Sequence, residues 1–354
     1  MKRVAIITLH GAANAGGLER VVAQHVAYLK RGHAVRVFSL PERGLVGWLR
    51  YRWRWVDYAM IALFPFVSWL PARLWSGRRG LLLSHGQASI GLTCDAVFAH
   101  SCYAALARAS GYKLGAYYLL SRAIQWLVAR LAKRVICVSE RVATEWAVHN
   151  GLIAQKSRVI HNSVDTSVFA PARPDEVVCA GVPLRVLFVG RADPLKGLDK
   201  LEQLHSQVAE VRPPVSVCLC FPTRPPPDVL ARFPLFQAKW GLEPAGMAEQ
   251  YGGADLFFLP SRYEAFELSS LEALACGTPV LLNATGTRPT LHLQGCPAVY
   301  DLESAPTPLA AVLDAASRFK GLRRETIACW TAEHFGGSSV PKVLGDLFTE
   351  MGLA

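Results

Sequence analysis

The sequence predicts an α/β protein of two domains, each built on a parallel β-sheet with helices on both faces. The chain has 354 residues, and at roughly 150 residues per domain this length suits two domains. Short apolar runs rich in β-branched residues alternate with helical patterns along the whole chain. Strands that lack polar alternation and are separated by helices are typical of parallel sheets covered on both faces.

The apolar runs are expected to form the strands, and two helices stand out among the helical patterns. The first helix has an apolar stripe at Leu18, Val22, Val26 and Leu29, and Gly32 ends it. An amphipathic pattern over residues 340–351 predicts a last helix. The expected strands are residues 4–9, 34–40, 96–99, 134–138, 184–189, 215–220, 256–259 and 280–282.

A break between the two domains is expected near residues 169–183. Pro171, Pro174, Gly181 and Pro183 interrupt the pattern there, and a second strand-rich series begins at Leu184. The sequence therefore predicts a first domain over residues 1–168 and a second over residues 169–334.

Composition and charge narrow the class of protein. With 51% hydrophobic and 18% charged residues, the chain is neither disordered nor a coiled coil. The 38 Lys and Arg against 27 Asp and Glu give a net charge of +11. Such a balance indicates a polyanionic partner or surface.

Cysteine usage and the apolar runs indicate a cytoplasmic, soluble protein. The nine cysteines show no zinc-binding spacing, and an odd number argues against a disulfide framework. The N-terminus enters a strand pattern directly, without the apolar core of a signal peptide. The longest apolar run, residues 58–70, contains Pro65 and is shorter than the about 20 residues of a membrane span.

Gly16-Gly17 lies between the first predicted strand and the first predicted helix. Glycines at that place let the backbone approach a ligand, and the start of the helix offers free N–H groups to a phosphate. A plain strand-to-helix turn explains the pair equally well. The dinucleotide-binding pattern Gly-x-Gly-x-x-Gly is absent from this stretch, which argues against an NAD site.

A second motif, residues 190–197, follows the predicted strand 184–189 and contains Arg191 and Lys196. Loops at the carboxyl ends of parallel strands are where α/β sheets bind ligands. An arginine can bind two phosphate oxygens at once, and a lysine adds a point charge. A solvated basic loop is the alternative.

The third motif, residues 260–280, is the most specific. It places Glu264 in the loop after a buried strand and Glu272 inside an apolar helix expected over residues 268–276. A carboxylate in such a helix is expected to have a partner. Carboxylates suit sugar hydroxyls, and the N–H groups of Leu268 and Ser269 suit a phosphate. A core helix with one buried ion pair is the alternative.

In this order and spacing the three motifs resemble glycosyltransferase family 4, retaining GT-B enzymes that use nucleotide-diphosphate sugars. The family's Glu-x₇-Glu is Glu264 and Glu272, and its Arg-x₄-Lys-Gly begins at Arg191 and includes Lys196. The resemblance covers nearly the whole chain. It implies two Rossmann-like domains facing each other across a deep cleft. It also implies that a C-terminal helix, residues 335–354, crosses back to the first, acceptor-side domain, leaving the second to bind the donor.

The same resemblance implies roles for these residues. Arg191 and Lys196 neutralise the donor diphosphate and the charge that grows on it. Glu272 accepts hydrogen bonds from the ribose hydroxyls, with Leu268 and Ser269 at the phosphate, and Glu264 lies near the donor sugar.

Three histidines and the glycine pair of the first domain complete the implied site. Gly16 and Gly17 approach the phosphates from the opposite domain. His100 matches the family's histidine that contacts the donor sugar, although a lone histidine is more often structural. His85 and His10 are further candidates for acceptor or donor contacts.

Two positions depart from the family pattern, which usually has glycines where this chain has Ala265 and Glu267. Glu267 stabilises the helix dipole but repels a diphosphate if its side chain points inward. Either it faces away or it contacts the sugar or the acceptor. No Asp-x-Asp motif appears. Because two cations already face the diphosphate, we expect no metal and no cofactor besides the sugar donor.

Residues 43–79 form a basic, aromatic stretch with five of the nine tryptophans and seven arginines against one acid, Asp57. Arginine and tryptophan around an apolar run suit a membrane interface with anionic lipid. A buried helix–loop–helix with solvated arginines is the alternative. Nucleic acid is a third possibility, but no nucleic-acid motif supports it.

The function expected from all this is transfer of a hexose from a UDP-sugar to a membrane-associated glycan acceptor, in the synthesis of lipopolysaccharide or another surface polysaccharide. The enzyme is expected to be cytoplasmic and peripheral to the inner face of the cytoplasmic membrane. A nucleotide-sugar epimerase of the same fold and a non-catalytic nucleotide-sugar-binding protein are the alternatives.

Overall fold

The computed structural model describes residues 2–9, 16–41, 48–49, 52–111, 115–181, 183–209, 211, 214–336 and 339–351. The chain forms two compact units. The first unit comprises Met1–Asn162 and Val343–Ala354, and the second unit comprises Ser163–Lys342. These limits differ from the predicted 168/169 and 334/335 because the segment after Ser163 already pairs with the second unit, where Val164 N–H donates to the carbonyl of Phe335 (2.9 Å).

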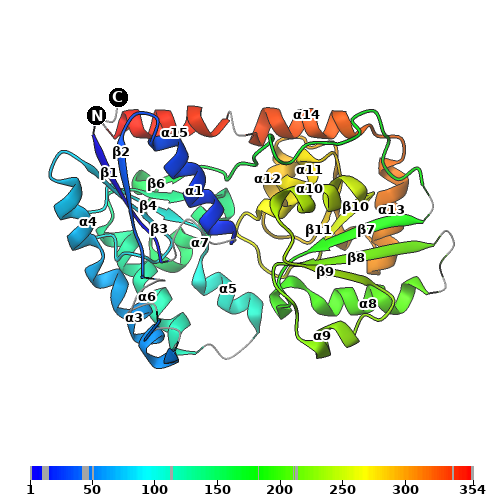
Figure 1. The fold of residues 1–354 in the computed structure, drawn as a ribbon, viewed down its shortest axis with the longest axis horizontal. Coiled ribbons are helices and arrows are strands. Elements are labelled where there is room, and N and C mark those ends of the chain that lie inside the picture. Colours follow the sequence, from blue (N-terminus) through cyan, green and yellow to red (C-terminus); the bar gives the residue numbers. More distant parts are fainter. Residues whose placement is uncertain are drawn as a thin grey trace. The chain divides into compact units, whose positions relative to one another are not determined.

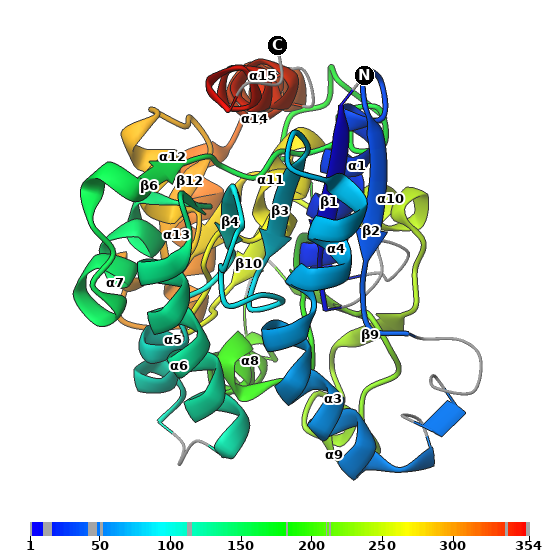
Figure 2. The ribbon, with the colours of Figure 1, turned by 90° about the vertical axis from the view of Figure 1, so that its left-hand side faces the viewer.

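The first unit contains a parallel six-stranded sheet in the order β2-β1-β3-β4-β5-β6. Its central strands are fully buried, as expected for a sheet covered on both faces. Figure 2 shows α4 packed along β1 and β3. The strands are β1 (Arg3–Ile7), β2 (Ala34–Phe38), β3 (Leu81–His85), β4 (Ala96–Ala99), β5 (Val135–Cys137) and β6 (Ser157–Val159).

The helices of the first unit include the apolar run of residues 58–70 and most of the chain's last helix. The final helix α15 (Ser339–Glu350) packs on α1, where the rings of Tyr28 and Phe348 stack at 6.2 Å. The other helices are α1 (Gly17–Leu29), α3 (Arg54–Val67), α4 (Trp69–Ser76), α5 (Tyr103–Ser110), α6 (Ala116–Leu131) and α7 (Glu140–Asn150).

The second unit contains a parallel six-stranded sheet in the order β12-β11-β10-β7-β8-β9. Helices α8 and α13 lie on one face, and α10, α11 and α14 on the other (Figure 1). The strands are β7 (Leu184–Val189), β8 (Val215–Phe221), β9 (Gln237–Trp240), β10 (Leu256–Leu259), β11 (Val280–Leu282) and β12 (Val299–Asp301). The helices are α8 (Leu198–Val208), α9 (Pro227–Ala231), α10 (Pro244–Gly253), α11 (Leu268–Ala275), α12 (Arg288–Leu293), α13 (Pro308–Phe319) and α14 (Arg324–Phe335).

The predicted class of two parallel α/β sheets is confirmed, with four strands that the sequence analysis missed. Three of them, β6, β9 and β12, are the last strands at the ends of their sheets and mix polar with apolar residues. The fourth, β3, lies at the centre of the first sheet and is leucine-rich rather than β-branched. An edge strand has a neighbouring strand on one side only, and its side chains are less fully buried. Its sequence therefore lacks the apolar run that marks a central strand.

Candidate active site

The loop after β7 and the loop after β10 meet at an ion pair between Lys196 and Glu264. The Nζ of Lys196 lies 2.5 Å from Oε1 of Glu264, and only 18% and 13% of the two side chains are exposed. Lys196 ends a short 3₁₀ turn, Pro194–Lys196, that begins at the Asp193 side chain. The structure thus joins the predicted diphosphate-binding lysine directly to the predicted sugar-binding carboxylate.

Gly197 explains how closely the two loops approach. Its φ is +75°, and a Cβ at this position would lie 2.2 Å from the carbonyl oxygen of Pro260. Only glycine combines this left-handed backbone with such close contact. The N–H of Arg262 also donates to the carbonyl of Leu195 (2.8 Å), so the lysine and glutamate loops are held together by backbone contacts as well as by charge.

Arg191 is placed differently from Lys196. Its side chain is 70% exposed and has a long contact with Asp193 in its own loop, 3.5 Å between Nη2 and Oδ2. An exposed arginine with a weak local partner is able to turn toward an incoming anion at little cost.

Glu267, the departure from the family pattern, is turned to a neighbouring loop. Its carboxylate accepts hydrogen bonds from the hydroxyls of Ser270 and Thr287 (2.6 Å each) and from the Thr287 N–H (3.0 Å). Burial, and after it the nearby charge of Glu264, raise the pKa of Glu267 to about 7. The sequence predicts that Glu267 either faces away from the diphosphate or contacts the sugar or the acceptor. In the structure its carboxylate faces Thr287 and Ser270. Its side chain makes no capping hydrogen bond to the first turn of α11.

Leu268 and Ser269 begin α11, and Glu272 lies one turn further along it. Helix α11 is buried along almost its whole length, and Glu272 is 5% exposed. As the sequence predicted for an acid in an apolar helix, the carboxylate has a partner. It is the hydroxyl of Tyr251 in α10, which donates to Oε2 at 3.0 Å. No sequence pattern indicated Tyr251, because its place opposite Glu272 depends on how α10 packs on α11.

The first unit holds the remaining predicted residues that the structure describes. Gly16 precedes α1 as its N-cap and Gly17 is its first residue. A Cβ on Gly16 would lie 2.0 Å from Oε2 of Glu19, so the start of this helix is approached by an acid of its own first turn. His10 lies outside the described residues.

His100 follows β4 and is paired with a second histidine. Its Nε2 lies 3.0 Å from Nδ1 of His85, which ends β3 and stacks on Phe98. The ring of His25 in α1 packs against the ring of His85, with 5.1 Å between their centroids. Burial lowers the pKa of His25 to about 3 and that of His100 to about 4, and it holds the pKa of His85 well below its usual value. The three rings are therefore neutral at physiological pH.

Sequence comparisons match both halves of the chain to glycosyltransferases. Residues 15–168 match the Glycosyltransferase Family 4 model, and residues 183–311 match the model of the Glycosyl transferases group 1. Together the two models cover well over half of the chain. By these two matches the chain is a glycosyltransferase with a family 4 domain and a group 1 domain.

Solved structures share the fold of this glycosyltransferase over the full chain. Sucrose-phosphate synthase from Thermosynechococcus elongatus is 19% identical, with a TM-score of 0.76 and full coverage of both chains. WaaG, a glycosyltransferase involved in lipopolysaccharide biosynthesis, is 18% identical, with a TM-score of 0.65 over 97% of this chain and 99% of that one. Anabaena HepE in complex with UDP and glucose is 15% identical, with a TM-score of 0.64 over 99% and 100%. At these identities the likeness establishes the GT-B fold.

Curated relatives match over a shorter region. Alpha-maltose-1-phosphate synthase of Mycolicibacterium smegmatis is 30% identical over 203 residues, which are 52% of each chain. D-inositol 3-phosphate glycosyltransferase of the same species is 34% identical over 181 residues, 46% of this chain and 40% of that one. The matched regions span about half the length of these relatives.

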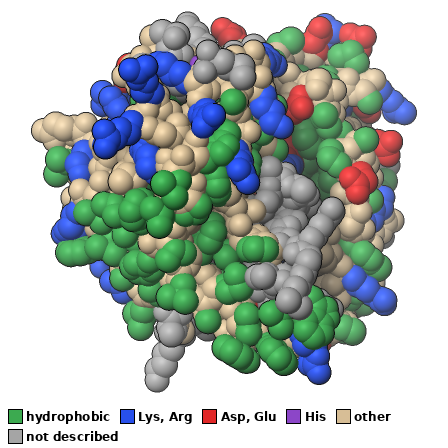
Figure 3. Space-filling view, turned by 60° about the vertical axis from the view of Figure 1, so that its left-hand side comes forward, with side chains coloured by type: hydrophobic (Ala, Val, Ile, Leu, Met, Phe, Trp, Pro, Cys, Tyr) green, Lys and Arg blue, Asp and Glu red, His purple; other side chains and the backbone are tan. Residues whose placement is uncertain are grey.

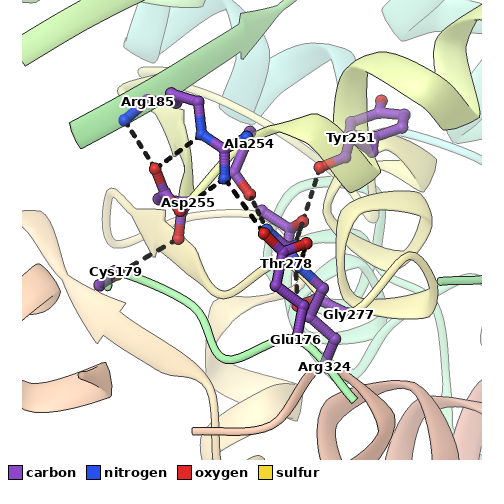
Figure 4. Close-up of polar contacts among 9 residues, drawn as sticks. All are labelled: Glu176, Cys179, Arg185, Tyr251, Ala254, Asp255, Gly277, Thr278 and Arg324. Carbon is purple, nitrogen blue, oxygen red and sulfur yellow. Dashed lines mark hydrogen bonds and ion pairs between the residues drawn. The ribbon is translucent and has the colours of Figure 1, made fainter. Parts of the chain in front are cut away.

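A largely buried polar network joins residues on either side of the segment that contains Glu264 and Glu272, and Figure 4 shows its contacts. Asp255, before β10, accepts two bonds from the Arg185 guanidinium, at 3.0 Å each. Arg324, at the start of α14, is 1% exposed and donates to the carbonyl of Ala254 (2.8 Å) and to the hydroxyl of Thr278 (3.1 Å). Thr278 follows α11, so the network fixes both ends of the segment that contains Glu264 and Glu272.

Proposed function

We propose that this glycosyltransferase moves a hexose from a UDP-sugar to a glycan acceptor with retention of the anomeric configuration. The observation that supports this most is the contact of Lys196 with Glu264, in the loops that follow the central strands β7 and β10. Glu264 lies in the same segment as the buried Glu272 of α11. A cation, a sugar-binding carboxylate and a ribose-binding carboxylate are the groups that a nucleotide-diphosphate sugar requires. HepE, solved in complex with UDP and glucose, and WaaG, which is involved in lipopolysaccharide biosynthesis, suggest the donor and the class of acceptor.

The residues act mainly through charge. When the bond between the anomeric carbon and the phosphate oxygen breaks, one negative charge develops on the diphosphate, where Lys196 and Arg191 stabilise it. The acceptor hydroxyl attacks the anomeric carbon from the face that the diphosphate leaves, and its proton passes to the departing phosphate oxygen. Attack on this face retains the configuration. Because the two side chains supply the positive charge, the proposed reaction needs no divalent metal.

The two glutamates provide the test. Glu272→Ala is expected to lower the affinity for UDP and for UDP-glucose by the same factor, about tenfold, because both ligands contain the ribose. Glu264→Ala is expected to weaken UDP-glucose more than UDP, because only the former contains the sugar. Calorimetric titration of both ligands into each variant measures this. Equal losses for both ligands in both variants would mean that the roles are misassigned.

We further propose that the first unit binds the inner face of the cytoplasmic membrane. The apolar segment folds into α3 and α4, and many of its large side chains are exposed rather than buried in a core, among them Trp55 (70%), Leu63 (63%) and Leu74 (75%). Figure 3 shows a broad hydrophobic area on the first unit with lysine and arginine side chains at its margin. Exposed apolar areas of this kind mark interaction sites.

The helices that the structure describes give no reason to prefer a membrane-spanning segment to a helix pair that lies on the membrane surface. No single helix there is long and apolar enough to cross a membrane, while one pair bent by 44°, Trp55–Val67 with Trp69–Ser76, passes by length and composition. Arg78 and Arg79 are exposed just after α4, so basic side chains border the apolar face. This arrangement suits a helix pair lying in the headgroup region of an anionic bilayer.

Vesicle flotation tests the membrane proposal. We expect binding to vesicles that contain anionic lipid and release by salt, because each arginine near the surface contributes about 1 kcal/mol within a Debye length. Replacing Leu70 and Leu74 by serine together with Arg78 and Arg79 by serine should abolish binding and leave donor binding unchanged. Leu293→Ser, equally exposed (75%) but in the second unit, is the matched control. Equal binding to neutral and anionic vesicles, or none to either, would contradict the proposal.

A further inference from the structure

The hydroxyl of Tyr251 is a direct polar partner of the buried Glu272. Tyr251 is fully buried in α10 and Glu272 is 5% exposed in α11, and the phenol donates to Oε2 over 3.0 Å. A hydrogen bond to a buried carboxylate is stronger than one between neutral groups. Because burial removes water, the phenol also replaces part of the solvation that the carboxylate has lost.

Tyr251 is itself held in place on several sides. Its ring packs edge-to-face against Phe169 (6.0 Å between centroids) and Phe257 (5.7 Å). Its backbone carbonyl accepts the hydroxyl of Thr278 (2.6 Å), which in turn accepts from the buried Arg324 (3.1 Å). Figure 4 shows this chain of contacts from Arg324 through Thr278 to Tyr251. The phenol oxygen therefore has a fixed position.

A fixed donor on one carboxylate oxygen limits the freedom of the whole group. A glutamate side chain turns about three bonds, and ordering such a side chain costs free energy that a ligand must otherwise supply on binding. We propose that Tyr251 is a positioning residue that orients the Glu272 carboxylate for the ribose hydroxyls of the donor nucleotide. This inference rests on the proposed role of Glu272, and it assigns Tyr251 no contact with the donor itself.

The test compares UDP with 2′,3′-dideoxy-UDP, which lacks the two hydroxyls that Glu272 is proposed to bind. Wild-type protein should bind UDP more tightly than the dideoxy compound. Tyr251→Phe keeps the packed ring and removes the phenol oxygen. It should lower the affinity for UDP about tenfold, because the loss of a hydrogen bond to a charged group has an effect of about this size. The affinity for dideoxy-UDP should change by less than about twofold. A loss of packing alone would weaken both compounds together.

Two controls accompany the variant. Tyr300→Phe removes a phenol from β12 of the same unit, where the ring packs on Phe319, and should change neither affinity. Thr278→Val removes the hydroxyl that binds the Tyr251 carbonyl and should narrow the difference between UDP and dideoxy-UDP, whereas Thr278→Ser should preserve it. The Thr278 pair gives the answer even if Tyr251→Phe folds poorly, which a melting curve detects.

The outcomes separate this inference from the proposed function. If wild-type protein prefers UDP and Tyr251→Phe keeps the full preference, Tyr251 does not position Glu272. If wild-type protein binds UDP and dideoxy-UDP equally, the ribose role of Glu272 is wrong and the inference fails with it. A preference that is lost in Tyr251→Phe and in Thr278→Val, but kept in Tyr300→Phe and Thr278→Ser, supports the inference.

Discussion

Replacing Lys196 by alanine is expected to lower the turnover of nucleotide sugar by about 100- to 1,000-fold, the usual cost of losing one preorganised electrostatic donor. The Nζ of Lys196 is the positive charge beside Glu264, at 2.5 Å. Without it the charge that develops on the diphosphate is no longer compensated, and the Glu264 carboxylate adds repulsion. Steady-state release of nucleoside diphosphate measures the effect.

Lys200→Ala is the matched control for this variant. Lys200 is exposed on α8, four residues further along the chain, and its loss should change turnover by less than about twofold. Because Lys196 is paired with a partly buried acid, a melting curve must show that Lys196→Ala remains folded at the assay temperature. Near-normal turnover of a folded Lys196→Ala protein would remove the basis of the proposed reaction.

Arg324→Met is expected to lower the free energy of unfolding by about 3–5 kcal/mol, the cost of removing one member of a buried polar and ionic network. The guanidinium is 1% exposed and donates to the Ala254 carbonyl and the Thr278 hydroxyl. Methionine has a similar length but no donor, so these buried groups lose their partner and are left unsatisfied. Denaturant unfolding followed by circular dichroism measures the loss.

The neighbouring residue supplies the comparison for this prediction. Arg323 is about half exposed, and its ion pairs with Asp175 and Glu325 lie at the surface. Arg323→Met should therefore change the free energy of unfolding by no more than about 1 kcal/mol. If the two methionine variants were equally stable, the network around Arg324 would not support the second unit.

The motifs could be placed from sequence because each is local. Glu264 and Glu272 lie in one strand–loop–helix segment, so the apolar strand and helix around them fixed their positions relative to one another. The same holds for Arg191 and Lys196 in the loop after β7. Strands β10 and β11, with their central, wholly apolar sequences, were predicted at their observed bounds for the same reason.

Contacts between distant segments were beyond the reach of sequence reasoning. Lys196 and Glu264 are 68 residues apart, and their ion pair depends on the approach that Gly197 allows. The partners of Glu267 in the loop after β11 and the partner of Glu272 in α10 likewise follow from tertiary packing. The sequence therefore indicated these charged side chains as candidates, but not the pairs that they form.

The most direct test of the proposed transferase is a side-by-side assay of wild-type protein and Lys196→Ala with UDP-, ADP-, GDP- and CDP-hexoses. Release of nucleoside diphosphate is followed in the presence and absence of membrane glycan acceptor. We expect the wild-type protein to release UDP from UDP-hexose and to transfer the sugar in retained configuration, and we expect Lys196→Ala to lose about 100-fold or more of this activity. No release from any of these donors, or equal release by both proteins, would contradict it.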